Sequence, residues 1–223
     1  RGFYGVEDSA INRFYYEEAK TQFPAVYSED CLNLNIWTRE DARGFPVLVY
    51  IHGGAFRTGG NGEPFVDGAA YAKRDVVMVS VNYRLGPFHS VYGDGYSGNL
   101  ALTDQITALA WVRDNIACFG GDPDNVTIFG QSGGGGKVTV LGQIPEAEGL
   151  FHKMIVMSGV ITGPLLSSDC DPKELFLEIL KNLNIDEKDV EKLEKVPVPQ
   201  FIWAVNKASK TLTSQGKRVN WSP

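Results

Sequence analysis

The chain has 223 residues, enough to bury the core of one large domain or two small ones, and its 43% apolar and 22% charged residues are ordinary for a globular protein. Its 27 acidic and 21 basic residues give a formal net charge of −6, which argues against nucleic acid or an anionic membrane surface as a partner. The longest apolar stretch, 154–166, is short and interrupted by glycine and proline, so we expect no membrane span.

Short apolar segments predict the strands of a mostly parallel sheet. Residues 31–37 alternate apolar and polar side chains, as a half-buried strand does. Nearly continuous apolar runs of this kind suit strands that are buried on both faces of a parallel sheet. Four such runs follow along the chain, at 45–51, 76–83, 126–129 and 154–160.

Helical patterns lie between these runs. Asp67 is placed to cap a short helix that continues through Lys73. Residues 104–119 gather apolar side chains largely on one face, and Gly120 is expected to end that helix. Alternating strands and helices predict right-handed crossovers, with helices on both faces of the sheet.

Beyond residue 165 the pattern becomes purely helical. The tetrapeptide 171–174 (DPKE) predicts a helix start, with an aspartate cap, a proline at the first helical position and a glutamate that reaches back to the cap. A second short helix is expected to start at Asp186 and to end at the Val-Pro-Val-Pro run 196–199.

The three cysteines, Cys31, Cys118 and Cys170, are odd in number, far apart and without a C-x-x-C pair. This pattern weakens both a disulfide framework and a zinc site. We therefore expect small unpaired thiols, and neither a metal nor another cofactor.

The stretch 126–138 (VTIFGQSGGGGKV) partly fits a phosphate-binding P-loop, which requires Gly, four residues, then Gly-Lys-Ser/Thr. Lys137 follows Gly136, but Gln131 stands where the first glycine is needed, and Val138 where the hydroxyl for Mg²⁺ is needed. Because both positions are chemically necessary, the P-loop interpretation is not supported.

The same stretch fits the G-x-S-x-G signature of a nucleophilic serine in full. Residues 130–134 follow a buried strand and open a helix-like stretch, which is the context that this signature requires. A sharp strand-to-helix turn would lift the Ser132 hydroxyl above the carboxyl edge of the sheet. A glycine-rich turn with an incidental serine is the alternative for this motif alone. Gly135 and Gly136 exceed what the motif needs, and we expect them to allow close packing against the sheet.

A second motif strengthens the serine interpretation. The segment 50–56 (YIHGGAF) leaves another buried strand with Gly53 and Gly54, and its backbone N–H groups can turn toward the same sheet edge, as an oxyanion hole requires. An ordinary strand-end turn would explain this segment alone, but it explains the two motifs together less well.

Several segments together resemble the type-B carboxylesterase family, which includes the cholinesterases, and are most similar to its bacterial branch, which includes para-nitrobenzyl esterases. The resemblance implies an α/β-hydrolase fold, with a mostly parallel central sheet and flanking helices, and hydrolysis of carboxylic esters. The segments that carry it are 28–38, 46–56, 79–88, 98–134 and 149–159.

Carried over position by position, the resemblance implies roles for five residues. Ser132 matches the nucleophile, and Gly54, Ala55 and Gly133 match the backbone donors of a three-membered oxyanion hole. Ser158 matches a buried serine that supports the catalytic acid and histidine. The family commonly has Glu and Ala beside the nucleophile where this chain has Gln and Gly. Neither change should abolish the chemistry, because the donor after the serine is a backbone N–H.

Two departures from the family pattern bear on organisation. Animal members pair the cysteine that matches Cys31 with one upstream, and residues 1–30 contain none, which favours a reduced, bacterial and cytoplasmic setting. The family's acid and histidine lie downstream of the last residue given. Residues 1–223 are therefore predicted to form a partial α/β-hydrolase domain, with core strands and serine turn at 31–160 and a helical segment at 165–210. The rest of that domain, on the same or a separate chain, would be its partner.

A serine is a weak nucleophile without an adjacent base, and α/β-hydrolases order the triad as Ser, acid, His. His152 follows Ser132, but it stands at the amino end of the strand 154–158, and five residues at ~3.3 Å place it roughly 17 Å from the serine edge. His52 is expected to pack beneath the oxyanion loop and His89 to face solvent. We therefore expect no complete triad within these residues.

The leading hypothesis is a serine hydrolase that acts on a small-molecule carboxylic ester through an acyl-enzyme on Ser132. Phe56, Phe88 and Tyr92 follow strands at the active edge and could line an apolar substrate pocket, with core packing an equal alternative for Phe56. A non-catalytic hydrolase-like binding domain and an inactive fragment remain alternatives. Adhesion members of the superfamily have lost the serine that this chain keeps.

Overall fold

The computed structural model describes residues 28–62, 66–93, 96–160 and 170–219. The chain divides into two compact units, one formed by residues 1–85 and 101–161, the other by residues 86–100 and 162–223. The first unit carries the sheet and the second is mainly helical, so each is described by itself.

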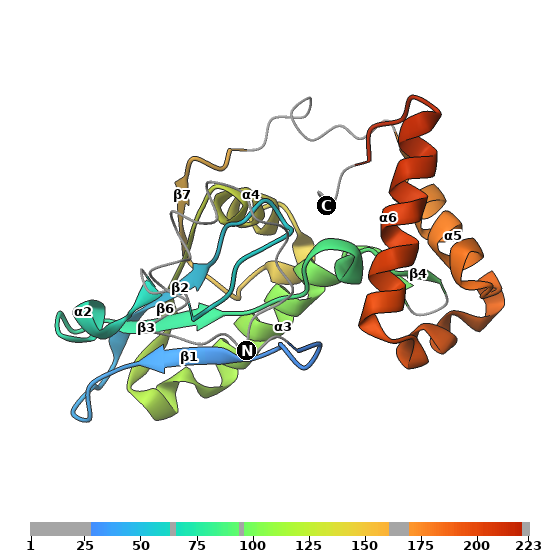
Figure 1. Ribbon diagram of the computed structural model, residues 1–223. Helices are drawn as coiled ribbons and strands as arrows, with labels where there is room; N and C mark the ends of the chain where they lie inside the picture. The colour runs from blue at the N-terminus through green and yellow to red at the C-terminus, as the bar shows by residue number, and fades with distance from the viewer. Residues whose placement is uncertain (1–27, 63–65, 94–95, 161–169, 220–223) are drawn as a thin grey trace. The chain divides into compact units, whose positions relative to one another are not determined.

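The first unit is built on a five-stranded sheet of order β1-β3-β2-β6-β7 (Figure 1). Strand β1 (Leu34–Trp37) runs antiparallel to β3 (Val77–Val81). The pairs β3 with β2 (Phe45–Ile51), β2 with β6 (Gly121–Gln131), and β6 with β7 (Lys153–Met157) are all parallel. The mostly parallel sheet expected from the sequence is confirmed, and β6 is longer than its apolar run.

Burial differs sharply between the central strands and β7. All five residues of β3 are buried, as are Val49 of β2 and Ile128 of β6. The prediction of burial on both faces is wrong for β7, where Met154 and Ile155 are each 48% exposed. Among the described residues β7 pairs only with β6. Its apolar side chains suit a strand that is covered on both faces, but the described residues leave them exposed.

Three helices in or bordering the first unit follow the predicted pattern. In α2 (Ala69–Ala72), the N-cap residue is Gly68, one position after the predicted Asp67, whose carboxylate accepts the Ala69 N–H at 2.9 Å. The helix α3 (Leu100–Asn115) begins four residues before the predicted start and continues into the 3₁₀ turn η3 (Ile116–Phe119). Gly120 ends this segment with a left-handed φ of 80°. The third helix, α4 (Gly133–Leu141), follows β6 directly.

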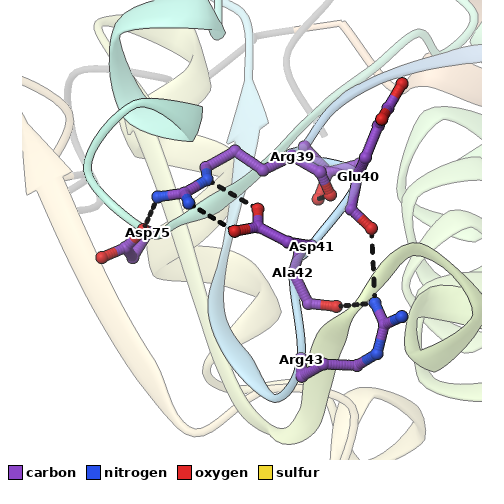
Figure 2. A network of polar contacts seen from close by, with 7 residues as sticks. Arg39, Glu40, Asp41, Ala42, Arg43 and Asp75 are labelled. Carbon is purple, nitrogen blue, oxygen red and sulfur yellow. Dashed lines mark hydrogen bonds and ion pairs between the residues drawn. The ribbon is translucent and has the colours of Figure 1, made fainter.

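A network of ion pairs joins Arg39, Asp41 and Asp75 (Figure 2). It lies at the amino end of β3, whereas the serine turn follows the carboxyl end of β6. Arg39, just after β1, contacts both carboxylate oxygens of Asp41 and reaches Asp75, just before β3, at 2.6 Å. Because β1 and β3 are antiparallel, this network joins the end of one strand to the start of its neighbour. All three side chains are exposed, so the network adds little stability.

The second unit contains two longer helices, α5 (Pro172–Leu183) and α6 (Val198–Ser214), joined by the 3₁₀ segment η6 (Glu187–Lys195). The Asp171 and Asp186 carboxylates cap α5 and η6 by accepting N–H groups at 2.9 and 3.0 Å, which confirms both predicted starts. Glu174, expected to reach back to the cap, instead pairs with Lys217. The remaining elements are η2 (Gly86–His89) and the two short strands β4 (Tyr92–Gly93) and β5 (Tyr96–Ser97).

Helices α5 and α6 lie side by side and form the core of this unit (Figure 1). The Phe88 ring packs against Phe201 at a centroid distance of 4.9 Å, and the Tyr92 ring against Phe176 at 6.0 Å. The structure therefore gives Phe88 and Tyr92 a packing role in the helical unit, where the sequence suggested a pocket lining. The buried residues of α5 and α6 that pack together in this core are Leu175, Ile179, Phe201, Ala204, Val205, Ala208 and Leu212.

Two negative findings apply to the described ranges. No helix there combines the length and the apolar composition that crossing a bilayer requires. No group of three or more His, Cys, Asp or Glu side chains in those ranges could hold a metal ion.

Candidate active site

Ser132 occupies a strained turn between β6 and α4. Its φ of 55° and ψ of −124° lie outside the regions that ordinary residues adopt, which costs about 1–3 kcal/mol and persists only where the surroundings enforce it. The surroundings hold its peptide groups on both sides. The Ser132 N–H donates to Met157 O at 2.8 Å, and the Ser132 carbonyl accepts the Gly136 N–H at 3.0 Å. The residue is exposed, so its hydroxyl is accessible at the carboxyl end of β6.

Glycines around the serine permit this turn because the backbones approach too closely for side chains. A Cβ added at Gly134 would lie 2.1 Å from Ile51 O at the end of β2. One at Gly135 would lie 2.9 Å from Met157 O, and one at Gly159 would lie 2.4 Å from the backbone of Gly135. The expectation that the additional glycines allow close packing against the sheet is confirmed for Gly135.

The loop after β2 turns tightly through three consecutive residues with positive φ: Gly54 at 102°, Ala55 at 52° and Phe56 at 62°. The Gly54 carbonyl accepts the Thr58 N–H at 3.0 Å and the Thr58 hydroxyl at 3.2 Å, which closes the turn. Two of these residues carry a Cβ in the left-handed region, so the loop stores backbone strain.

The serine turn and the strained loop lie against each other. A Cβ added at Gly133 would lie 3.1 Å from Ala55 N, and one at Gly53 would lie 3.6 Å from Ser132 Cβ. Gly133 is the first residue of α4, and the first N–H groups of a helix have no acceptor within it. The structure thus brings the start of α4 and the backbone of Ala55 together beside Ser132.

Ser158 follows β7 directly and has a φ of 51°. The resemblance implied a buried serine, whereas Ser158 is exposed. The difference has the same origin as the exposure of β7, because the described residues leave this edge of the sheet uncovered.

His52 packs beneath the strained loop, as predicted. It is 1% exposed, and its ring stacks on Tyr83 at 4.2 Å. The ring Nδ1 lies 2.9 Å from Gly53 O, while the Tyr83 hydroxyl donates to His52 O at 2.5 Å. Burial, followed by the nearby Lys137 charge, lowers the pKa of His52 to about 3. A ring with so low a pKa is a poor general base at neutral pH.

Of the predictions for the other two histidines, the one for His152 is confirmed and the one for His89 is wrong. His152 is exposed and exchanges hydrogen bonds with Val126 at the amino end of β7, which confirms its predicted position. His89 was expected to face solvent, and this is wrong, because it is only 1% exposed. The chain after β3 coils into the 3₁₀ turn η2 there, and His89 is one of the buried residues of that turn.

A buried lysine beside the site was missed. Lys137 is 1% exposed, and its Nζ donates to Gly133 O at 3.3 Å and lies 3.7 Å from the Phe56 ring centroid. Sequence reasoning considered Lys137 only as a failed P-loop residue. The available signal was a single charge within an otherwise glycine-rich and apolar helix, four residues after Gly133.

A group of amides around the buried Asn61 and Asn82 was missed as well. The Asn61 N–H donates to Asn82 Oδ1 at 2.7 Å, its side-chain amide donates to Asn33 Oδ1 at 2.9 Å, and its carbonyl accepts the Ser80 hydroxyl at 2.8 Å. These bonds anchor the chain after the strained loop to β1 and β3. The only signal in the sequence was an asparagine within each of the predicted strand segments 31–37 and 76–83, with a third ten residues after the segment 45–51.

Comparison with protein families gives a match to the carboxylesterase family over residues 9–223. Para-nitrobenzyl esterase of Bacillus subtilis (strain 168) is 42% identical over 185 residues, which cover 80% of this chain and 37% of that protein. Phenmedipham hydrolase of Pseudarthrobacter oxydans is 47% identical over 134 residues, or 59% of this chain and 27% of that protein.

Solved structures of related proteins share the fold. An esterase from anaerobic Clostridium hathewayi, described as able to hydrolyze aliphatic aromatic polyesters, superposes with a TM-score of 0.83 at 40% identity, covering all of this chain and 46% of that one. A thermophilic para-nitrobenzyl esterase gives a TM-score of 0.78 at 36% identity, over 95% of this chain and 44% of that one. This chain therefore spans less than half the length of each of these relatives.

Proposed function

Because this chain belongs to the carboxylesterase family and has its α/β-hydrolase fold, we propose that it carries the nucleophile and the oxyanion hole of a serine hydrolase for small-molecule carboxylic esters. One observation carries the proposal. Ser132 sits on a strained, exposed turn whose following residue, Gly133, lies directly against Ala55 of a second strained loop. A turn that served packing alone would not need two adjoining strained backbones.

In the proposed reaction the Ser132 oxygen attacks the ester carbonyl carbon and loses its proton to a histidine. The backbone N–H groups of Gly54, Ala55 and Gly133 stabilise the negative charge on the carbonyl oxygen. Collapse of this intermediate breaks the bond to the alcohol, which leaves with the proton. Water then attacks the acyl-enzyme, releasing the acid and restoring the serine.

We place the histidine and the catalytic acid in the remaining part of the hydrolase domain, on the same or a separate chain. His52 is buried under the loop with its pKa lowered to about 3, and His152 lies at the far end of β7. The exposed β7 and Ser158 mark the edge of the sheet where that remaining part would attach. Ser158 would then become buried and support the acid and histidine.

Labelling with a fluorophosphonate probe tests the proposal, because such probes phosphonylate only activated serines. The full-length protein should be labelled, the Ser132→Ala variant should not, and Ser214→Ala, at an exposed serine of α6, should label normally. A folded wild-type protein that takes no label would contradict the proposal and favour a non-catalytic binding domain or an inactive fragment. Labelling that persists in Ser132→Ala would assign the nucleophile elsewhere.

A further inference from the structure

Lys137 is a buried basic residue that the proposed reaction does not use. It lies on α4, five residues after Ser132, and is 1% exposed. Burying an amine is unfavourable unless specific contacts replace its hydration. Three groups do so: Gly133 O at 3.3 Å from Nζ, the Phe56 ring centroid at 3.7 Å and the Tyr83 ring centroid at 4.6 Å.

These contacts join the two backbone segments that meet at the serine. Gly133 opens α4, and Phe56 belongs to the strained loop, directly after Ala55. The two segments approach so closely that a Cβ at Gly133 would lie 3.1 Å from Ala55 N and 3.5 Å from Phe56 N. One side chain therefore holds a peptide carbonyl of the first segment and an aromatic ring of the second.

The strained loop requires contacts that restrain its backbone. Non-glycine residues with positive φ persist only where the surroundings over-determine them, and Ala55 and Phe56 are two in succession. Ala55 offers only a methyl group, so the 6%-exposed Phe56 ring is the larger side chain by which the protein can fix this turn. An amine over the ring face restrains it through a cation–π contact.

We propose that Lys137 is a positioning residue of the oxyanion hole, holding the N–H groups of Ala55 and Gly133 at the separation that the reaction needs. The inference rests on the proposed function. Burial lowers the pKa of Lys137 well below its ordinary value, but a protonated and a neutral amine both donate to a carbonyl. The link to Gly133 therefore survives in either state, and the contact with the Phe56 ring is a cation–π contact for the protonated amine and a weaker N–H to ring contact for the neutral one. The lysine also contacts the Tyr83 ring, which stacks on the ring of the buried His52.

The test is Lys137→Met in the full-length protein, with Lys207→Met, at an exposed lysine of α6 that lies over the Trp203 ring, as the matched control. Turnover of para-nitrophenyl acetate and inhibition by an alkyl trifluoromethyl ketone, which forms an oxyanion on the serine, are compared. We expect kcat to fall on the order of 10-fold with little change in KM, and the ketone to bind more weakly by a similar factor. Rates are normalised to folded protein, since a merely structural lysine would change the unfolding temperature but not these constants.

A second variant covers the case in which Lys137→Met does not fold. Phe56→Leu keeps apolar bulk but removes the ring face, so it should lower kcat and ketone affinity in the same way. In the double variant the two losses should be strongly non-additive, because both substitutions break one link. Additive losses, or wild-type kcat and ketone affinity in either single variant, would overturn the inference.

Ser132→Ala separates this inference from the proposed function. A wild-type protein without esterase activity overturns the proposed function, and the inference with it. An active wild-type protein, an inactive Ser132→Ala variant and a Lys137→Met variant with unchanged constants overturn the inference alone.

Discussion

Gly134 shows how little space the single residues of the serine turn leave one another. The position where a Cβ would stand is 2.1 Å from Ile51 O and 2.8 Å from His52 O, and both obstacles are backbone atoms. Backbone cannot swing aside as a flexible side chain does, so any larger residue must move α4 away from β2. The hydrolase motif calls for glycine here, and the physical reason is this approach of helix and strand.

We expect Gly134→Ala to destabilise the protein by about 1–3 kcal/mol through overpacking, and to abolish labelling of Ser132 because the serine moves with the helix. Gly62→Ala is the matched control, since a Cβ at Gly62 would meet none of the described residues within 4 Å. Urea denaturation measures the stability change. A Gly134→Ala variant as stable and as reactive as Gly62→Ala would show that α4 can shift freely.

At the scale of elements, a buried ion pair fixes the chain that leaves β3 to helix α3. Asp104 on α3 accepts the backbone N–H of Arg84 at 3.0 Å, its Nε at 2.8 Å and its Nη2 at 2.5 Å. The Asp104 side chain is 4% exposed and that of Arg84 is 31% exposed. This pair differs from the exposed network in Figure 2, because several charge-assisted hydrogen bonds go to one carboxylate that is buried.

Asp104→Asn should therefore cost about 3 kcal/mol of unfolding free energy, because it removes the charge of a buried carboxylate that accepts three hydrogen bonds from Arg84. The exposed Arg39 provides the comparison, and Arg39→Ala should cost less than about 1 kcal/mol although it also breaks contacts to two carboxylates. Chemical denaturation of both variants gives the two numbers. Equal costs would mean that burial does not distinguish these ion pairs.

At the scale of the whole molecule, the first unit ends on an exposed edge. Met154, Ile155 and Met157 of β7 are 48%, 48% and 37% exposed, and β7 pairs with β6 alone among the described strands. Exposed apolar strands with an open pairing edge associate readily. The chain spans 37% of its Bacillus subtilis relative, which fits the proposal that another part of the domain covers this edge.

Residues 1–223 expressed alone should therefore self-associate, and Ile155→Lys should reduce the association by placing a charge on the exposed strand. In the full-length protein the same substitution should instead lower stability, because the strand would then be covered. Sedimentation velocity and thermal unfolding measure the two effects. A monomeric wild-type fragment, or a full-length protein indifferent to Ile155→Lys, would contradict this account of β7.

The sequence by itself determined the parts of this protein that depend on local pattern. Apolar runs located β2 and β3 closely, the Asp171 and Asp186 caps started their helices, and the two glycine motifs identified the serine turn and the strained loop. Each of these features is encoded by residues adjacent in the chain, because backbone conformation and strand or helix period are local properties.

Tertiary structure alone decided which side chains are covered. It buried His89, exposed β7 and Ser158, used Phe88 and Tyr92 for packing, and placed Lys137 between Gly133 and Phe56. Burial and contact depend on neighbours that are distant in sequence. Gly133 and Phe56 are 77 positions apart, so no local pattern could predict that one lysine touches both.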